Sequence, residues 1–308
     1  MSGSSFKKPY INGYYMEKTS PTTYKMLKIK NKVYSKQSKY QRIEVIDFEE
    51  YGRCLVLDNL IQLSELDEHL YHEMHVHPTL ISHENPEKVL ILGGGDGGVL
   101  REVLKHECVK KVIMVEIDEE VIETVKKYIP NIPRGTFEDP RVKIVIDDGK
   151  RYVEETSEKF DIILMDLTDP EPSGPSIQLY GKEFFKRIKR ILEEDGILLL
   201  QSSGYEMYGR KILEIQETLK EIFKYVGIYA SYVPAYGGEW TFTYASDKVD
   251  VLGLGLEEIS RRYMYRKLNT KYYNPELHFS LRYSMKSLLE KIKLFSEIQT
   301  KPHQSISS

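Results

Sequence analysis

The chain has 308 residues, of which 41% are hydrophobic and 30% are charged, and its formal net charge is −3. This length favours two domains, or one large domain with an appendage, and the apolar content can fill a sizeable core. With a net charge this close to zero, the protein has no overall positive charge that would attract nucleic acid. No apolar run approaches the roughly 18 residues of a membrane span.

The first 20 residues are polar and lack the apolar segment of a signal peptide, so we expect a cytoplasmic protein. The two cysteines, Cys54 and Cys108, do not form a C-x-x-C pair, and we expect buried or idle thiols rather than a disulfide. The abundance of Lys and Glu is a feature of thermophilic proteins.

Residues 1–66 are predicted to form a small antiparallel β-domain. Strand-like segments lie at 25–29, 32–34, 42–47 and 54–57, with turns at Asn31, 50–52 and 58–59. A sheet of this size is too small to be stable alone, so it should pack on the larger domain or on a second subunit. Its edge strands lead us to expect a homodimer or homotetramer.

A helix is predicted from Asp67 to Ile81, with four histidines around it: His69, His72, His75 and His77. They tempt a metal interpretation. However, the motif H-E-x-x-H would need its second histidine at position 76, where this chain has Val76. The two histidines four residues apart that bind zinc from one helix face are therefore missing. We therefore expect no metal site.

Buried strands and helices alternate through the following residues. The strands are expected at 88–92, 111–116, 142–146, 160–165 and 197–201, and the helices at 98–106, 118–128, 150–156 and 181–192. This alternation predicts an α/β fold with a doubly wound, Rossmann-like, largely parallel sheet, whose ligands lie beyond the carboxyl ends of the strands.

The last part of the chain is expected to complete this domain, which we place at residues 67–300. A helix to about residue 224 precedes two strands, 228–233 and 240–245, which would add an antiparallel edge to the sheet. Helices at 257–268 and 275–292 follow. Residues 301–308 are expected to be disordered.

The turn after the first strand of the sheet carries the pattern G-x-G-x-x-G at Gly93, Gly95 and Gly98. Glu116 ends the next strand, 21 residues after Gly95, where a carboxylate can accept hydrogen bonds from ribose hydroxyls. Asp96 lies inside the turn and would repel a pyrophosphate. These features predict a cationic sulfonium nucleoside of the S-adenosylmethionine type rather than NAD.

Acidic residues follow four successive strands of the predicted sheet: Asp96, Glu116, Asp147 with Asp148, and Asp166 with Asp169. A rim of this kind suggests that the second reactant is also a cation. The pair Asp166 and Asp169 can hold an ammonium group by charge-assisted hydrogen bonds and take a proton from it. An amine nucleophile fits this description.

The joint occurrence of these motifs resembles the spermidine synthase family of aminopropyltransferases. The stretches that carry the resemblance are Ser38-Lys39-Tyr40-Gln41, Val56-Leu57-Asp58 with Ile61-Gln62, Asp67-Glu68-x-x-Tyr71-His72-Glu73-Met74, residues 93–102, Glu116-Ile117-Asp118, Asp148-Gly149 and Asp166-x-x-Asp169-Pro170. The family fold is a class I methyltransferase-like sheet with an N-terminal β-domain. The resemblance implies transfer of the aminopropyl group from decarboxylated S-adenosylmethionine, a co-substrate, to a polyamine, without a metal or other cofactor.

The resemblance also implies roles for individual residues. Those of the nucleoside site are Gln41, Gly93, Gly95, Glu116, Ile117, Asp148, Gly149 and Pro175. Asp96, His72 and Gln62 would hold the amine ends. Asp166 would be the base, and Asp169 would position the acceptor with Tyr71 and Tyr236.

Three departures from the family pattern bear on the acceptor. Leu167 and Thr168 separate the two acids, where Ser-Thr, Ser-Ser or Cys-Thr is usual, and the loop 171–180 is longer and resembles that of thermospermine synthases. The segment 201–204 lacks the acid that is common in enzymes using putrescine. We expect spermidine as the acceptor and thermospermine or spermine as the product.

Three alternatives stay open at this point. The first is a spermidine synthase that uses putrescine or another diamine. The second is an S-adenosylmethionine-dependent methyltransferase, although such an enzyme should not place Asp96 and Asp166 beside the methionine carboxylate. The third is a polyamine-binding protein without catalytic activity, which would have no reason to combine Asp166 with a nucleoside rim. The segment 170–180, rich in Pro, Gly and Ser, is a candidate lid.

Overall fold

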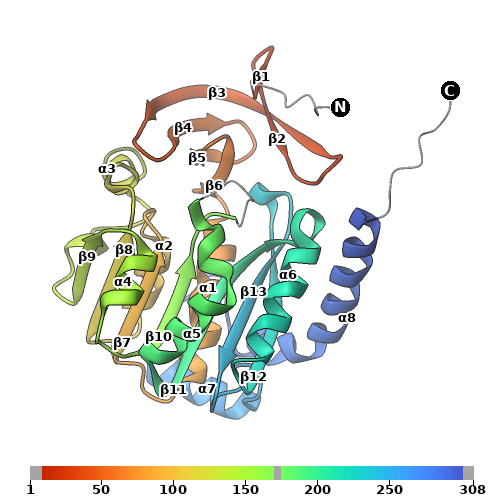
Figure 1. The fold of residues 1–308 in the computed structure, drawn as a ribbon. Coiled ribbons are helices and arrows are strands. Elements are labelled where there is room, and N and C mark those ends of the chain that lie inside the picture. Colours follow the sequence, from red (N-terminus) through yellow and green to blue (C-terminus); the bar gives the residue numbers. More distant parts are fainter. Residues whose placement is uncertain (1–8, 170–174, 301–308) are drawn as a thin grey trace.

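A computed structural model of the chain describes residues 9–169 and 175–300 (Figure 1). The N-terminal part is a six-stranded sheet in which each strand is antiparallel to its neighbour and strand order follows the chain. Its strands are β1 (Tyr10–Ile11), β2 (Tyr14–Lys18), β3 (Tyr24–Gln37), β4 (Arg42–Phe48), β5 (Gly52–Leu57) and β6 (Leu60–Ser64).

The turn expected at Asn31 is wrong, because β3 continues through it as one strand of 14 residues. The register between β3 and β4 shifts on either side of this position, between Ile29 and Asn31 and again between Lys32 and Tyr34. Such bulges absorb an unpaired residue and bend the strand without ending it. The short strands β1, β2 and β6 were not expected from the sequence.

The central sheet has seven strands in the order β12-β13-β11-β10-β7-β8-β9. Its strands are β7 (Lys88–Gly93), β8 (Lys111–Glu116), β9 (Val142–Ile146), β10 (Phe160–Asp166), β11 (Leu192–Gly204), β12 (Tyr225–Val233) and β13 (Gly238–Ser246). The five strands from β9 to β11 are parallel, whereas β13 and β12 form an antiparallel edge. The predicted doubly wound α/β fold is thus confirmed.

Helices cover both faces of this sheet, as the continuous apolar runs of its strands require. Along β7, Val89 and Ile91 point into one buried cluster, while Leu90 and Leu92 point into the other. The first cluster packs against α1 (Glu68–Ser82) and α2 (Gly98–Leu104), together with residues of α7 (Leu256–Tyr265) and α8 (Pro275–Thr300). The second packs against α4 (Gly149–Glu155), α5 (Lys182–Ile191) and α6 (Tyr205–Lys220).

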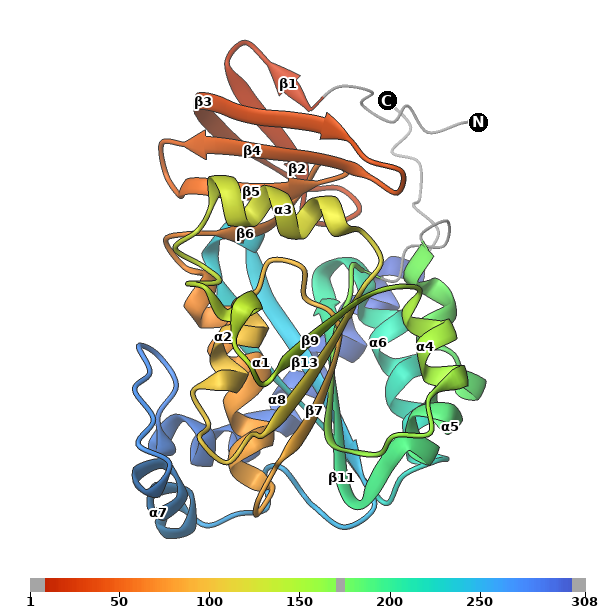
Figure 2. The ribbon, with the colours of Figure 1, turned by 90° about the vertical axis from the view of Figure 1, so that its left-hand side faces the viewer.

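The N-terminal sheet lies across the carboxyl ends of the central strands, with α3 (Glu119–Tyr128) beneath it (Figure 2). Val121 and Val125 of α3 are buried against Ile43 and Leu55 of the N-terminal sheet. Each buried side chain of this size contributes roughly 1.5–3 kcal/mol, so this contact fixes one sheet over the other. The predicted domain boundary at residue 66 falls between β6 and α1 and stays a prediction.

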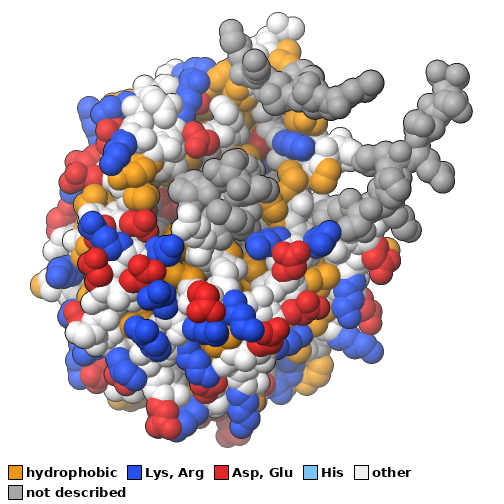
Figure 3. Space-filling model, viewed as in Figure 1, with side chains coloured by type: hydrophobic (Ala, Val, Ile, Leu, Met, Phe, Trp, Pro, Cys, Tyr) orange, Lys and Arg blue, Asp and Glu red, His pale blue; other side chains and the backbone are white. Residues whose placement is uncertain are grey.

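Within the described residues, none of the helices combines the length and apolarity that crossing a bilayer requires. Acidic and basic side chains intermingle over the face shown in Figure 3. The expectation of disorder for residues 301–308 falls outside the described residues.

Candidate active site

A cavity of about 630 Å³ is lined by residues at the carboxyl ends of the central strands and by residues of the N-terminal sheet. The sheet winds in opposite directions from β7 and β10: the chain leaves β7 toward β8 and β9, and leaves β10 toward β11. Ligands of doubly wound sheets bind at such switch points. The cavity is lined from this side by Gly93, Gly94, Gly95, Asp96 and Asp166, and from the N-terminal sheet by Gln41, Leu57 and Gln62.

The glycine turn brings bare backbone to this cavity. Gly93 and Gly94 have φ of +82° and +76°, in the left-handed region that side chains disfavour. A Cβ on Gly95 would lie 3.0 Å from Oε2 of Glu116. The glycines of the predicted motif therefore serve the turn itself and the close approach of the Glu116 carboxylate.

The residues expected to hold the nucleoside line one side of the cavity. They are Gln41, Gly93, Gly95, Glu116, Ile117, Asp148 and Gly149. The Gln41 amide donates to Asp118 over 3.1 Å, and Glu116 accepts from the backbone of Asp118 over 2.9 Å. Burial raises the pKa of Glu116 to about 7. Pro175 begins a short 3₁₀ helix, but its side chain lies outside the described part of the chain.

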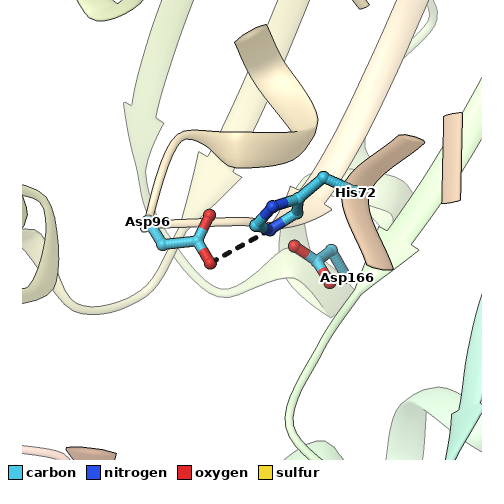
Figure 4. Close-up of side chains that lie close together, drawn as sticks. All are labelled: His72, Asp96 and Asp166. Carbon is cyan, nitrogen blue, oxygen red and sulfur yellow. Dashed lines mark ion pairs between the residues drawn. The ribbon is translucent and has the colours of Figure 1, made fainter. Parts of the chain in front are cut away.

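Three largely buried charged side chains, Glu68, His72 and Asp96, contact one another in series next to the glycine turn. Nδ1 of His72 lies 2.6 Å from Glu68, and Nε2 lies 3.3 Å from Asp96 (Figure 4). Burial alone would lower the pKa of His72, but the two carboxylates outweigh it and raise the pKa to about 10. Burial likewise opposes ionisation of Asp96, yet His72 and the Gly98 amide lower its pKa. His72 is thus an imidazolium held between two carboxylates.

His72, Asp96 and Asp166 bring ligand-type atoms within 4.8 Å of one another, close enough to surround a metal ion. A metal-bound imidazole must be neutral and must offer a lone pair to the ion. His72 instead points its nitrogens at carboxylates that keep it protonated. The set is therefore better suited to a ligand with its own ammonium protons than to a metal ion.

Asp166, the last residue of β10, faces Asp96 across the turn (Figure 4). The hydroxyl of Tyr71 donates to Oδ1 of Asp166 over 2.6 Å. Burial and the charge of Asp96 raise the pKa of Asp166 to about 6, against the opposing effects of His72 and Tyr71. A carboxyl group with this pKa is ionised at neutral pH and can also carry a proton, which is what a general base requires.

Aromatic side chains form the wall beside this carboxylate. The rings of Tyr71 and Tyr236 are in edge contact at 5.6 Å, and Tyr236 contacts Trp240 at 4.8 Å. The hydroxyl of Tyr236 donates to the backbone carbonyl of Gln62. The predicted residues Gln62, Tyr71 and Tyr236 are therefore brought together at one wall.

Asp169 belongs to a second polar group, farther along the cavity. Its Oδ1 accepts from the Ser203 hydroxyl over 2.7 Å, and the Gln201 amide lies 3.4 Å away. Oε1 of Gln201 accepts in turn from Trp240 over 3.0 Å. Gln201 is thus fixed in orientation, in the segment 201–204 that lacks the acid common in enzymes using putrescine.

The lining residues that the sequence interpretation missed include Glu17, Glu206 and Trp240. Glu206 is the second residue of α6, which starts directly after β11, so the same strand-end signal that identified the other acids could have found it. Glu17 forms an ion pair with Lys25 at 2.6 Å, and no motif in the sequence marked it as a site residue. Of the predicted residues, His72 does not line the cavity itself, because it lies behind Asp96.

The comparisons agree with this geometry. The sequence matches the spermine/spermidine synthase domain over residues 68–252 and the spermidine synthase tetramerisation domain over residues 13–65. It is 43% identical over 270 residues to a polyamine aminopropyltransferase of Korarchaeum cryptofilum, covering 87% of this chain and 83% of the relative. A polyamine aminopropyltransferase of Thermoanaerobacter sp. is 42% identical, covering 82% and 88%.

A solved structure shows the same fold. A spermidine synthase in complex with the transition-state analogue AdoDATO superposes with a TM-score of 0.84 at 33% sequence identity. The match covers 93% of this chain and 97% of that structure.

Proposed function

Since this chain belongs to the spermine/spermidine synthase family and is a polyamine aminopropyltransferase, we propose that it moves the aminopropyl group of decarboxylated S-adenosylmethionine to spermidine. The observation that carries the proposal is the position of Asp166, beside Asp96 and in the same cavity as Glu116. One cavity is thereby lined by a base (Asp166), by a carboxylate that can bind the ammonium group of the donor (Asp96), and by a carboxylate that can accept hydrogen bonds from the ribose hydroxyls (Glu116).

The proposed chemistry is a single displacement. An acceptor amine gives a proton to Asp166, and its nitrogen attacks the propyl carbon bonded to the sulfonium. The new C–N bond forms as the C–S bond breaks, and the bonding pair stays on sulfur as 5'-methylthioadenosine leaves. Positive charge moves from sulfur to nitrogen, and carboxylates held at the nitrogen stabilise that movement. Holding both reactants in line lowers the remaining barrier.

The other site residues take supporting roles in this proposal. Gln41, Glu116, Ile117, Asp148 and Gly149 hold the nucleoside, together with the bare backbone of the glycine turn and Pro175. Asp96, backed by His72, and Gln62 bind the ammonium of the aminopropyl group. Tyr71, Asp169 and Tyr236 position the acceptor. The reaction we propose uses no metal or other cofactor, because the donor sulfonium already supplies the leaving group.

The far end of the cavity favours a triamine as acceptor. Beyond Asp169 the lining is Gln201 and Trp240, and Glu206 follows beside Gly204 and Gly238. Glu17 also lines the cavity, but its charge is balanced by Lys25. A diamine would lack a free anion for its second ammonium near Asp169. A triamine can pass the Trp240 ring, where each buried methylene contributes about 0.8 kcal/mol, and reach Glu206.

A competition assay tests both parts of the proposal. The protein is incubated with decarboxylated S-adenosylmethionine and equimolar putrescine and spermidine, and the products are separated by chromatography. We expect methylthioadenosine together with thermospermine or spermine; the resemblance of the 171–180 loop favours thermospermine. Spermidine formed from putrescine as the main product would overturn the acceptor but leave aminopropyl transfer intact. Absence of methylthioadenosine with either amine would overturn the activity.

We also propose that the protein is a homo-oligomer in the cytoplasm. The match to a tetramerisation domain covers most of the N-terminal sheet and favours a homotetramer over a homodimer. Tyr24 and Met26 on that sheet are 42% and 53% exposed, as expected for side chains that a partner subunit would cover. Light scattering coupled to size exclusion gives the mass, and a monomer would overturn this proposal.

A further inference from the structure

His75 is a buried histidine that the mechanism above does not use. It lies on α1 one turn after Tyr71 and is fully buried. Its Nδ1 lies 3.2 Å from the Tyr71 hydroxyl and 3.6 Å from Oδ1 of Asp166. Its Nε2 has no hydrogen-bond partner among the residues that the structure describes. Within residues 9–169 and 175–300, the polar neighbour of His75 within hydrogen-bond reach is therefore the tyrosine that contacts the proposed base.

The imidazole of His75 is neutral at working pH. Burial and the positive charge of nearby His72 lower the pKa of His75 to about 3, against a weaker opposing effect of Asp96. A neutral imidazole carries one ring proton, on either Nδ1 or Nε2. Which nitrogen carries it decides whether His75 donates to Tyr71 or accepts from it.

The geometry around Tyr71 selects the donor form. The hydroxyl has a single proton, and two acceptors compete for it: the Asp166 carboxylate at 2.6 Å and the imidazole at 3.2 Å. An ionised carboxylate is the stronger acceptor and lies closer. The Tyr71 proton therefore points to Asp166, and the Tyr71 oxygen is left to accept a hydrogen bond from Nδ1–H of His75.

We propose that His75 is a positioning residue that fixes Tyr71 as a hydrogen-bond donor to Oδ1 of Asp166, and this inference rests on the proposed role of Asp166 as the base. With Oδ1 occupied, Oδ2 is left to take the proton from the amine. Oδ2 lies 3.5 Å from where a Cβ on Gly94 would stand, and both Gly94 and Asp166 line the cavity. His75 thereby sets which oxygen of the base reacts.

A double-mutant cycle between His75 and Tyr71 tests the inference. The variants are His75→Leu, Tyr71→Phe and both together, and kcat and kcat/KM for the amine are measured against pH at saturating donor. Loss of the Nδ1 donor should lower kcat by up to about tenfold, the upper end of the range for loss of one hydrogen bond between neutral groups. It should also move the acid limb of kcat/KM to higher pH, because the Tyr71 hydrogen bond lowers the pKa of Asp166. Asp96, His72 and Tyr236 also face Asp166 and are unchanged in every variant.

The cycle should be strongly non-additive, because the imidazole acts through the tyrosine hydroxyl. Once Tyr71 is Phe, His75→Leu should change kcat less than twofold. His75→Asn, whose side-chain amide keeps a donor near the Nδ1 position, should recover most of the activity. An equal cost of His75→Leu in both backgrounds, or an unmoved acid limb, would overturn the inference.

His278→Leu is a matched control, because Nδ1 of His278 lies 2.7 Å from the Tyr273 hydroxyl in a buried pair outside the cavity. It should lower the melting temperature without moving the acid limb. If His75→Leu does not fold, ring ¹⁵N shifts of the unaltered protein decide instead: we expect the Nδ1–H tautomer, and the Nε2–H tautomer would contradict the inference. Asp166→Asn with full turnover would overturn the proposed base itself, which is a different outcome.

Discussion

Asp166 and Gly93 are register partners in the parallel pairing of β10 with β7, and the α-carbon of Gly93 faces the backbone carbonyl of Asp166. A Cβ on Gly93 would stand 2.2 Å from that carbonyl oxygen. The same carbonyl accepts a hydrogen bond from the amide of Gly94 over 3.1 Å. The backbone that carries the proposed base thus rests directly on the glycine turn that shapes the nucleoside side of the cavity.

This contact predicts that Gly93→Ala is severely destabilising. The added methyl group meets backbone, which cannot move aside, and φ at this position is +82°. We expect a loss of about 2 kcal/mol or more in unfolding free energy, and an activity loss larger than the unfolded fraction explains, because Asp166 shifts. Urea unfolding and turnover of the same samples measure the two effects.

Gly135→Ala is the matched control. Gly135 has a similar φ of +78°, but a Cβ there would meet nothing within 4 Å. It should cost only the backbone term of about 1–2 kcal/mol and leave turnover per folded molecule unchanged. Equal effects of the two substitutions on stability and turnover would mean that the contact between Gly93 and Asp166 contributes to neither.

The parts of the fold that could be predicted are those set by local pattern. Val89 to Leu92 is apolar at every position because the strand is buried on both faces, and such apolar runs also identified the inner parallel strands β8, β10 and β11. The N-terminal strands are harder. In β3, Asn31 and its neighbours have turn chemistry, but pairing with β4 overrides it and leaves bulges.

The site divides in the same way. Asp96, Glu116 and Asp166 follow predicted strands, so the rule that ligands bind at strand ends places them together. Trp240 enters the cavity from the antiparallel edge, and only tertiary structure brings that edge to Asp169, whereas Glu206 follows the end of β11 and carries the same strand-end signal as the other acids. The proposed role of His75 depends on its contact with Tyr71, one helical turn earlier on α1. No motif in the sequence marks this contact.

Asp166→Asn should abolish the base while preserving the cavity. The amide keeps the shape and still accepts a hydrogen bond from Tyr71, but it cannot take a proton. We expect kcat to fall by about 100-fold or more, with the affinity for methylthioadenosine unchanged. Asp161→Asn, at the opposite end of β10, is the control: its carboxylate holds the amides of Glu87 and Lys88 outside the cavity, so turnover should stay near normal. Normal turnover by Asp166→Asn would place the base elsewhere.

Binding of methylthioadenosine should strengthen as the pH rises through about 7. The ribose hydroxyls donate to the Glu116 carboxylate, and burial raises the pKa of this group to about 7 in the unliganded protein. Below that pH the group is protonated and must lose its proton to accept both hydrogen bonds. The product has lost the aminopropyl group and its ammonium, so calorimetry between pH 5.5 and 8.5 reports on the nucleoside side alone. The affinity should rise up to tenfold per pH unit on the acidic side and level off above the pKa.

Glu116→Gln provides the control for this pH dependence. The amide has the same shape and can accept one hydrogen bond, but it does not titrate. Its affinity for methylthioadenosine should be lower and independent of pH over the same range. A pH dependence that persists in Glu116→Gln would assign the titration to another group.

S-adenosylmethionine should bind much more weakly than its decarboxylated form. Its carboxylate would meet Asp96 and Asp166, which lie together in a largely buried part of the cavity. Like charges in such a site cost several kcal/mol, so the affinity ratio should reach 100-fold or more. Asp96→Asn should narrow this ratio, because it removes one of the two repelling charges. Equal affinities measured by calorimetry in the unaltered protein would remove Asp96 from the account of donor selection.

Glu206→Gln should separate the two possible acceptors. Glu206 lines the cavity beside Gly204 and Gly238, and burial and the charge of Glu239 raise its pKa. A triamine that extends from Asp166 past Trp240 would place its distal ammonium there, whereas a diamine would end short of it. Loss of one charge-assisted hydrogen bond costs about 1.5 kcal/mol, so kcat/KM for spermidine should fall by about tenfold and that for putrescine by less than twofold. Glu214→Gln, on the exposed side of the same helix, should change neither value. An equal loss of kcat/KM for both amines would show that Glu206 does not distinguish the two acceptors by their length, and that other residues do so.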